Sequence, residues 1–166
     1  MEMKYCMECG TRLNPKMLEG EGEIPYCDTC GAFRFPVFNT AISMIVMNEA
    51  RDQILLIEQY GKPGYVLVAG YVNKGEDAEA AARREAAEEL GLTLTAVQFN
   101  RSRYFAPSNT LMLNFTVTAA AQEARPNAEI DRYNWFSVEE ARQQIRQNSL
   151  AQAFLEGYLT GSYPWD

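Results

Sequence analysis

The stretch from Gly70 to Leu92, GYVNKGEDAEAAARREAAEELGL, limits what this chain can fold into more than any other part of it. It begins as a glycine-bearing loop, and Asp77 is a suitable N-cap for the alanine-rich segment 78–90 that follows. Gly91 is the residue expected just after a helix end. The stretch therefore predicts a loop followed by one helix.

Charged side chains gather at the C-terminal end of this helix. Glu85 is three residues from Glu88 and four from Glu89, so the three carboxylates share one helical face, and Arg84 lies beside them. Like charges at this spacing repel, and acidic residues in a last turn oppose the helix dipole. The pattern indicates either a solvated acidic surface or a bound cation.

Composition narrows the chemistry. The 166 residues include no histidine, which excludes Ser/His and Cys/His nucleophilic catalysis and histidine-ligated metals. The net charge of −7 argues against binding to nucleic acid by bulk electrostatics. No apolar run is long enough to span a bilayer, and the first residues do not resemble a signal peptide, so we expect a cytoplasmic protein with no membrane partner.

Four cysteines form two C-x2-C pairs separated by 17 residues: Cys6, Cys9, Cys27 and Cys30. This spacing favours four thiolates around one Zn²⁺, and such a closed site is structural because it has no open coordination position. Two disulfides in a secreted domain are the alternative. We expect a zinc ribbon over 1–35 that depends on its metal to fold, and a main domain over 36–166.

The main domain contains both strand-like and helix-like segments. Ser137 and Glu140 have the spacing of a capping box at a helix start, and Gly161 is a suitable helix end. The expected strands are 40–48, 53–58, 65–68, 92–100, 110–120 and 130–136; the expected helices are 78–90, 138–147 and 149–159; and the expected loops are 61–64, 101–109 and 122–128.

The central stretch matches the pattern G-x5-E-x7-R-E-U-x-E-E-x-G-U, where U is apolar, through Gly70, Glu76, Arg84, Glu85, Glu88, Glu89, Gly91 and Leu92. This resembles the Nudix box, the motif that defines the Nudix hydrolases. The resemblance implies an α/β/α sandwich with a mixed sheet, in which the box forms a loop, a helix and a second loop.

Other segments resemble the NADH pyrophosphatase branch of that family, which carries a four-cysteine ribbon and is typically homodimeric. The similar segments are Ala69-Gly70-Tyr71, Glu129-Ile130, Trp135-Phe136 and Ser149-Leu150-Ala151. The branch also carries a loop SQPWPFPxS that marks dinucleotide specificity. The matching segment here, SRYFAPSNT over 102–110, keeps only part of that pattern.

The resemblance implies hydrolysis of a nucleoside diphosphate linked to another group, with Mg²⁺ or Mn²⁺ held by carboxylates. It implies Glu85, Glu88, Glu89 and Glu129 as metal ligands, with Glu88, Glu89, Arg84 and Glu129 in the catalytic machinery. Arg84 would orient a glutamate through a charged hydrogen bond. Glu129 is either a ligand or the general base, and a surface-loop glutamate is the other interpretation of it.

For substrate binding we expect Gly70 to allow close backbone approach and Tyr71 and Phe105 to stack on a ring, although packing would equally explain both aromatics. NAD(H) or a related dinucleotide is the expected substrate. The alternatives are ADP-ribose, a nucleotide sugar, a nucleoside triphosphate or a capped RNA end. A non-catalytic ligand-sensing module is a further alternative.

Overall fold

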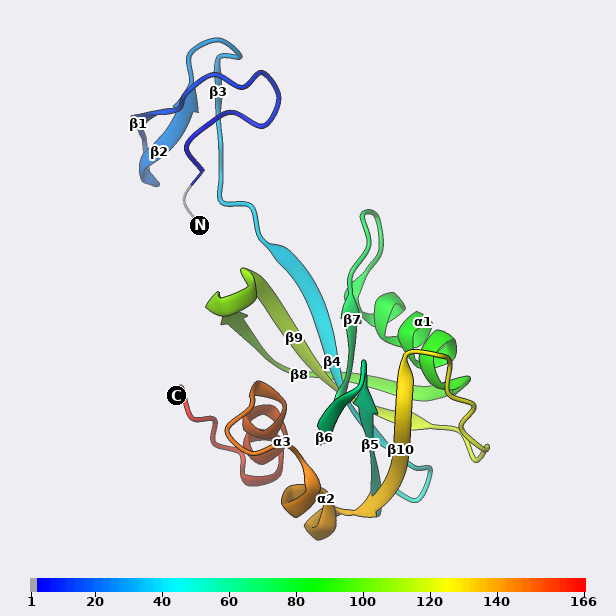
Figure 1. Cartoon of the computed structure of the whole chain (residues 1–166). Coiled ribbons are helices and arrows are strands. Elements are labelled where there is room, and N and C mark those ends of the chain that lie inside the picture. Colours follow the sequence, from blue (N-terminus) through cyan, green and yellow to red (C-terminus); the bar gives the residue numbers. More distant parts are fainter. Residues whose placement is uncertain (1–2) are drawn as a thin grey trace. The chain divides into compact units, whose positions relative to one another are not determined.

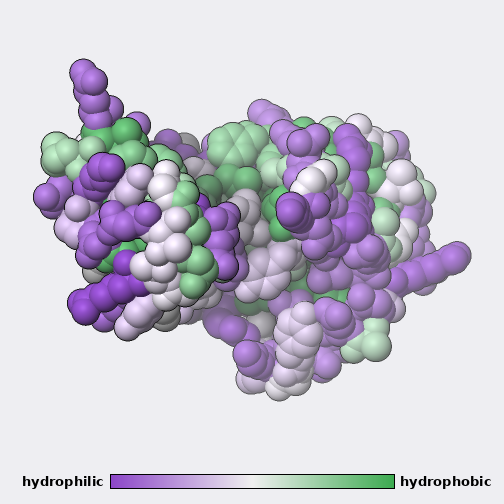
Figure 2. Space-filling view, turned by 90° about the horizontal axis from the view of Figure 1, so that it is seen from above, coloured by the Kyte–Doolittle hydropathy of each residue, from purple (hydrophilic) through white to green (hydrophobic). Residues whose placement is uncertain are grey.

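The computed structural model describes residues 3–166, and the chain divides into two compact units, Met1–Asn39 and Thr40–Asp166. Each unit has its own sheet (Figure 1). Among residues 3–166, no helix combines the length and the apolar character needed to cross a bilayer. Figure 2 shows a largely hydrophilic face on which hydrophobic side chains form separate patches.

The larger sheet has the order β10-β5-β4-β9-β8, with β6 paired to β5 and β7 paired to β4. Three α-helices and one short 3-10 helix, Ala106–Ser108, accompany it. The strands are β4 (Asn39–Met47), β5 (Gln53–Gln59), β6 (Lys62–Val66), β7 (Val68–Tyr71), β8 (Leu94–Phe105), β9 (Thr110–Ala119) and β10 (Ile130–Ser137); the helices are α1 (Ala78–Leu90), α2 (Val138–Gln144) and α3 (Leu150–Thr160).

Alternate residues of the central strands face two separate cores. On β4, Ile42, Met44 and Val46 pack in the core that α1 covers, whereas Ile45 and Met47 pack in the core that α2 and α3 cover. The period-2 alternation of a strand produces this division. Helices therefore cover both faces of the sheet (Figure 1), and the predicted α/β/α sandwich is confirmed.

Helix α1 has the extent that the sequence predicts. Its small buried alanines and Leu90 face the sheet, so the helix lies close to β7. Gly91 ends it with φ 63°, and the Gly91 N–H donates to the Ala87 carbonyl at 3.0 Å, which is the αL type of helix end. Asp77 occupies the N-cap position, but its side chain makes no capping hydrogen bond. The predicted Ser137–Glu140 capping box on α2 is confirmed.

The expected loop over 101–109 is wrong for its first half. Strand β8 continues to Phe105, because each residue from Arg101 onward pairs with one on β9. The serine, proline and aromatic content of the segment favoured a loop. Cross-strand pairing with β9, which the local sequence does not reveal, overrides that preference.

Further boundaries differ from those expected, and the expected strand over 65–68 is divided between β6 and β7. The segment 61–64 contains the start of β6, where Pro63 is tolerated beside the turn because the strand does not belong to the main path of the sheet. Helix α2 ends at Gln144, short of the expected Gln147, since Ile145 leaves the helix to form a parallel bridge with Tyr65.

The smaller unit is a three-stranded ribbon of β1 (Asn14–Leu18), β2 (Gly22–Cys27) and β3 (Ala32–Phe33). Within residues 3–39, the buried side chains are Cys6 and Cys27, so the ribbon has no apolar core of its own. Both C-x2-C pairs form the same turn. The Gly10 N–H donates to the Cys6 carbonyl at 2.9 Å, and the Gly31 N–H donates to the Cys27 carbonyl at 2.8 Å.

The four cysteine sulfurs meet in one place. All lie within 4.8 Å of one another, with Cys6 and Cys30 3.9 Å apart and Cys9 and Cys27 3.4 Å apart. Four thiolates about 2.3 Å from a tetrahedral ion are roughly 3.8 Å apart. The cysteines are free and not disulfide-bonded, and the cluster could hold a metal ion.

We expect removal of that ion with a chelator to unfold the ribbon and to leave the larger unit folded, because only the metal replaces the missing apolar core. Amide hydrogen exchange, followed by mass spectrometry, measures each part separately. Protection over 14–33 should collapse, whereas protection in β4, β5 and β9 should remain. Unchanged protection of the ribbon after complete metal loss would contradict this expectation.

Candidate active site

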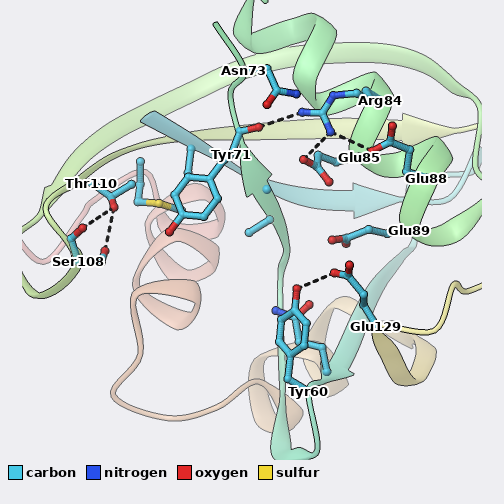
Figure 3. A pocket seen from close by; sticks show the side chains of 15 residues that line it. Tyr60, Tyr71, Asn73, Arg84, Glu85, Glu88, Glu89, Ser108, Thr110 and Glu129 are labelled. Atoms are coloured by element: carbon cyan, nitrogen blue, oxygen red, sulfur yellow. Dashed lines mark hydrogen bonds and ion pairs between the residues drawn. The ribbon is translucent and has the colours of Figure 1, made fainter. Parts of the chain in front are cut away.

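A cavity of about 440 Å³ opens beside α1, in the size range of small-molecule sites. Figure 3 shows side chains from α1, β7, the β5–β6 turn, the β8–β9 hairpin and the loop before β10 converging on it. The lining residues are Ala41, Gln59, Tyr60, Ala69, Gly70, Tyr71, Asn73, Arg84, Glu85, Glu88, Glu89, Ser108, Thr110, Met112 and Glu129.

Arg84 organises one side of the cavity by donating from every N–H of its guanidinium. Nε and Nη2 donate to the two carboxylate oxygens of Glu76 at 2.8 and 3.0 Å, a bidentate pair. Nη1 donates to Glu85 at 2.8 Å and to Glu88 at 3.0 Å, and Nη2 also donates to the Tyr71 carbonyl at 2.9 Å. Arg84 is thus a positioning residue that ties α1 to the preceding loop and to the end of β7.

The contacts of Arg84 lower the proton affinity of Glu76, the carboxylate in the loop before α1. Hydrogen bonds from the Arg84 side chain and from the Asn73 backbone N–H lower the pKa of Glu76 to about 2. The Glu76 contacts in turn raise the pKa of Arg84. Both groups stay ionised at any physiological pH, so this part of the site does not switch.

Glu89 lies one turn beyond Glu85 on the same face of α1 and is only 5% exposed. Among residues 3–166, none donates a hydrogen bond to its Oε2, although that atom is buried. Burial, and then the charges of Glu85, Glu129 and Glu88, raise the pKa of Glu89 to about 7. An ionised Glu89 therefore lacks the partner that a buried charge requires.

Glu129 faces Glu89 from the loop before β10 (Figure 3). Its Oε2 accepts a hydrogen bond from the Tyr60 hydroxyl at 2.6 Å, and this bond raises the pKa of Tyr60 to about 12. The backbone N–H of Glu129 donates to the Asn127 side chain at 2.9 Å. Glu129 is therefore held at both its backbone and its carboxylate.

The donor set suits a hard divalent cation, because all of its donors are carboxylate oxygens and one of them is buried without a partner. Unlike the cysteine sulfurs, no three carboxylates within residues 3–166 bring their oxygens within 4.8 Å of one another. Arg84 draws Glu85 and Glu88 to one side, and Tyr60 holds Glu129 on the other. The carboxylates thus line one cavity without their oxygens converging on a single point.

Gly70 lies directly against Glu85. A Cβ at position 70 would overlap the carboxylate carbon and Oε1 of Glu85, so the glutamate occupies the space that any other residue would fill. Gly70 pairs with Ile42 on β4, and its φ is not in the left-handed region, so contact with Glu85, and not backbone conformation, is what requires glycine here.

The cavity brings together most of the site residues that the sequence predicts: Gly70, Tyr71, Arg84, Glu85, Glu88, Glu89 and Glu129. Phe105 is not among the lining residues; it ends β8 opposite Thr110. Four other lining residues were not predicted from the sequence: Tyr60, Ser108, Thr110 and Met112. Ser108 and Thr110 lie in the hairpin that replaces the SQPWPFPxS loop, and their hydroxyls are 2.9 Å apart.

Comparison with known proteins identifies the family. The model of the NUDIX domain matches residues 37–156, which is most of the chain. The chain belongs to the NUDIX family. The matched residues include helix α1 and the loop before it, and the α/β fold agrees with this family.

Two curated NUDIX relatives are each named NAD-capped RNA hydrolase NudC. The one from Stutzerimonas stutzeri (strain A1501) is 30% identical over 159 residues, covering 94% of this chain and 56% of the relative. The one from Vibrio cholerae is 28% identical over 162 residues, covering 95% and 58%. This chain thus spans just over half the length of the curated relatives it matches.

Solved NUDIX structures share the fold. A NUDIX hydrolase from Nitrosomonas europaea has a TM-score of 0.61 at 20% identity and covers 97% of this chain and 95% of its own. The NUDIX domain of Shewanella oneidensis NrtR, solved with ADP ribose, has a TM-score of 0.64 at 13% identity and covers 82% of this chain and 93% of its own. At these identities, the likeness shows the fold alone.

The contact of Gly70 with Glu85 predicts the effect of Gly70→Ala. The added methyl group overlaps the Glu85 carboxylate, so we expect a loss of about 1–3 kcal/mol in the free energy of unfolding, measured in urea. In a Glu85→Ala background the overlap disappears, and Gly70→Ala should then cost little. An equal loss in both backgrounds would show that some other contact requires glycine.

The buried Glu89 predicts a pH-dependent stability when no divalent cation is present other than the metal at the cysteine cluster. Its pKa in the folded chain, about 7, lies above the ordinary 4.5, so between these values the folded state binds more protons than the unfolded state. The free energy of unfolding should therefore fall as pH rises from about 4.5 to about 7. Glu89→Gln cannot ionise, so it should become progressively more stable than the unmodified protein across this window.

The difference in free energy of unfolding between Glu89→Gln and the unmodified protein should grow by about 3.5 kcal/mol at most, at roughly 1.4 kcal/mol for each unit of pKa difference. Thermal unfolding at several pH values, with the cysteine cluster kept loaded with metal, measures it. Glu79→Gln, on the exposed start of α1, is the matched control and should show no such trend. A gap between Glu89→Gln and the unmodified protein that does not grow with pH would contradict the prediction.

Proposed function

We propose that this chain is a metal-dependent hydrolase that cleaves the pyrophosphate bond of an NAD group, either in NAD(H) or a related dinucleotide or at a capped RNA end. The single observation that carries this is the charge of the cavity. Its lining has four carboxylates and one guanidinium, and the contacts within the protein already occupy that guanidinium. A polyanionic pyrophosphate would bind there only together with divalent cations.

When bound, Mg²⁺ or Mn²⁺ would neutralise the pyrophosphate and lower the pKa of an attacking water. Glu85, Glu88 and Glu89 on α1, with Glu129 opposite, are the proposed ligands, and Glu129 remains the candidate for the general base as well. Arg84 would act through Glu85 and Glu88 by fixing their direction. For the ribbon, we propose a structural Zn²⁺ at the four cysteines, the metal that four-thiolate sites with this spacing hold.

The other end of the cavity supports a nucleotide-type ligand. Tyr71 is 59% exposed and presents its ring to the cavity, where it could stack on a base or a nicotinamide (Figure 3). Ser108 and Thr110 supply hydroxyls near it. The curated relatives named NAD-capped RNA hydrolase favour a capped RNA end as the second candidate substrate.

We expect a substrate panel to separate these candidates. Cleavage of NADH should yield NMNH and AMP, and cleavage of NAD-capped RNA should yield NMN and a 5′-monophosphate end, each only with added Mg²⁺ or Mn²⁺. Glu85→Gln should lower the rate at least a hundredfold while the chain remains folded, because a neutral amide is a poor metal ligand. Glu79→Gln is the matched control and should keep the rate.

Two results would count against the proposal. Hydrolysis at the full rate without any divalent cation would show that the reaction does not depend on a metal at the carboxylates. Turnover of ADP-ribose, nucleotide sugars or nucleoside triphosphates in preference to both NAD substrates would support cleavage of a pyrophosphate bond. It would show that NAD is not the preferred substrate. For each carboxylate, loss of Mn²⁺ binding in the glutamine variant indicates a ligand, whereas retained Mn²⁺ binding with lost rate indicates the general base.

A further inference from the structure

The turn between β5 and β6 has an unusual residue at its tip. Gln59 pairs with Lys62, so Tyr60 and Gly61 form a two-residue hairpin loop. Both have positive φ, 57° and 63°, as in a type I′ turn. Glycine and asparagine adopt this conformation readily, but a bulky aromatic residue is strained in it. The needs of the turn therefore do not explain a tyrosine at position 60.

The contacts of Tyr60 give a different explanation. Its hydroxyl donates to Glu129 Oε2 at 2.6 Å, and its backbone N–H donates to the Glu129 carbonyl at 3.3 Å. The next residue, Gly61, donates its N–H to Asp131 Oδ2 at 2.6 Å. The turn thus holds the segment that carries Glu129 at three points. Strained residues that persist in folded proteins cluster at functional sites.

Glu129 depends on such contacts for its orientation more than the carboxylates of α1 do. It lies on an exposed loop and faces Glu89 across the cavity, so repulsion between the two favours rotation of Glu129 into solvent. The Tyr60 hydroxyl opposes that rotation (Figure 3). It occupies only one carboxylate oxygen, and since it is neutral it leaves the negative charge of Glu129 in place.

We propose that Tyr60 is a positioning residue that keeps Glu129 directed into the cavity as a ligand for the divalent cation. This rests on the proposed metal-dependent hydrolase and adds to it a residue outside the α1 motif. Hydrogen-bonding partners of metal ligands typically contribute a factor of 10 to 100 in metal affinity.

The first test is Tyr60→Phe, which removes the hydroxyl and keeps the ring and the strained backbone. With the cysteine cluster loaded with metal, we expect Mn²⁺ to bind about tenfold more weakly, measured by the electron paramagnetic resonance signal of free Mn²⁺. Tyr133→Phe is the matched control. It removes a hydroxyl that donates to the Ala124 carbonyl at 3.1 Å, outside the cavity, and should leave Mn²⁺ affinity unchanged.

A double-mutant comparison shows whether Tyr60 acts through Glu129. In a Glu129→Gln background, Tyr60→Phe should weaken Mn²⁺ binding no further, because the ligand is already lost. In the otherwise unmodified protein, raising the Mn²⁺ concentration should restore the rate of Tyr60→Phe. A role confined to folding would instead change Mn²⁺ binding by the same factor in both backgrounds.

Tyr60→Asn separates metal binding from stability. Asparagine suits the positive φ, so this variant should melt at or above the temperature of Tyr60→Phe and yet bind Mn²⁺ as weakly. Unmodified Mn²⁺ affinity in Tyr60→Phe or in Tyr60→Asn would overturn the role of Tyr60 alone. Absence of Mn²⁺ binding at the carboxylates of the unmodified protein would instead overturn the proposed function, and the role of Tyr60 with it.

Discussion

The guanidinium of Arg84 is the interaction on which the rest of the cavity depends. Its planar set of N–H groups joins three parts of the chain: the loop before α1 through Glu76, the end of β7 through the Tyr71 carbonyl, and the last turns of α1 through Glu85 and Glu88. A lysine has no such fork of donors and could not make all of these contacts. The positions of loop, strand and helix are therefore fixed together, and the carboxylates are set by the same group.

That arrangement has an energetic cost at Glu89. With Arg84 occupied by other carboxylates, the buried Oε2 of Glu89 has no donor within residues 3–166, and the surrounding negative charges oppose its ionisation. A hydrophobic residue there would stabilise the fold more. Natural proteins keep such locally unfavourable groups where function needs them. The same feature that destabilises the fold without a cation makes the site a strong candidate for holding one.

Local sequence patterns predict correctly those features that depend on residues close together in the sequence. Helix α1, its end at Gly91 and the carboxylate face follow from spacings of three and four residues, and the capping box of α2 follows from one spacing of three. The extension of β8 to Phe105 depends on pairing with β9, and the contact of Tyr60 with Glu129 joins residues 69 apart in sequence. No periodicity within a short window carries such information, so a loop was expected at 101–109 and Tyr60 was missed.

Arg84 and the Tyr60 hydroxyl both orient carboxylates, but they differ in charge, so they affect the charge of the cavity differently. Arg84 is permanently cationic, so it partly neutralises Glu85 and Glu88 while it orients them. The Tyr60 hydroxyl is neutral, so it orients Glu129 and leaves its charge intact. Within residues 3–166, Glu89 and Glu129 thus form no ion pair, unlike Glu85 and Glu88. A divalent cation would gain most beside Glu89 and Glu129, and a pyrophosphate would reach it from the side of Tyr71, where the lining carries hydroxyls and an aromatic ring in place of carboxylates.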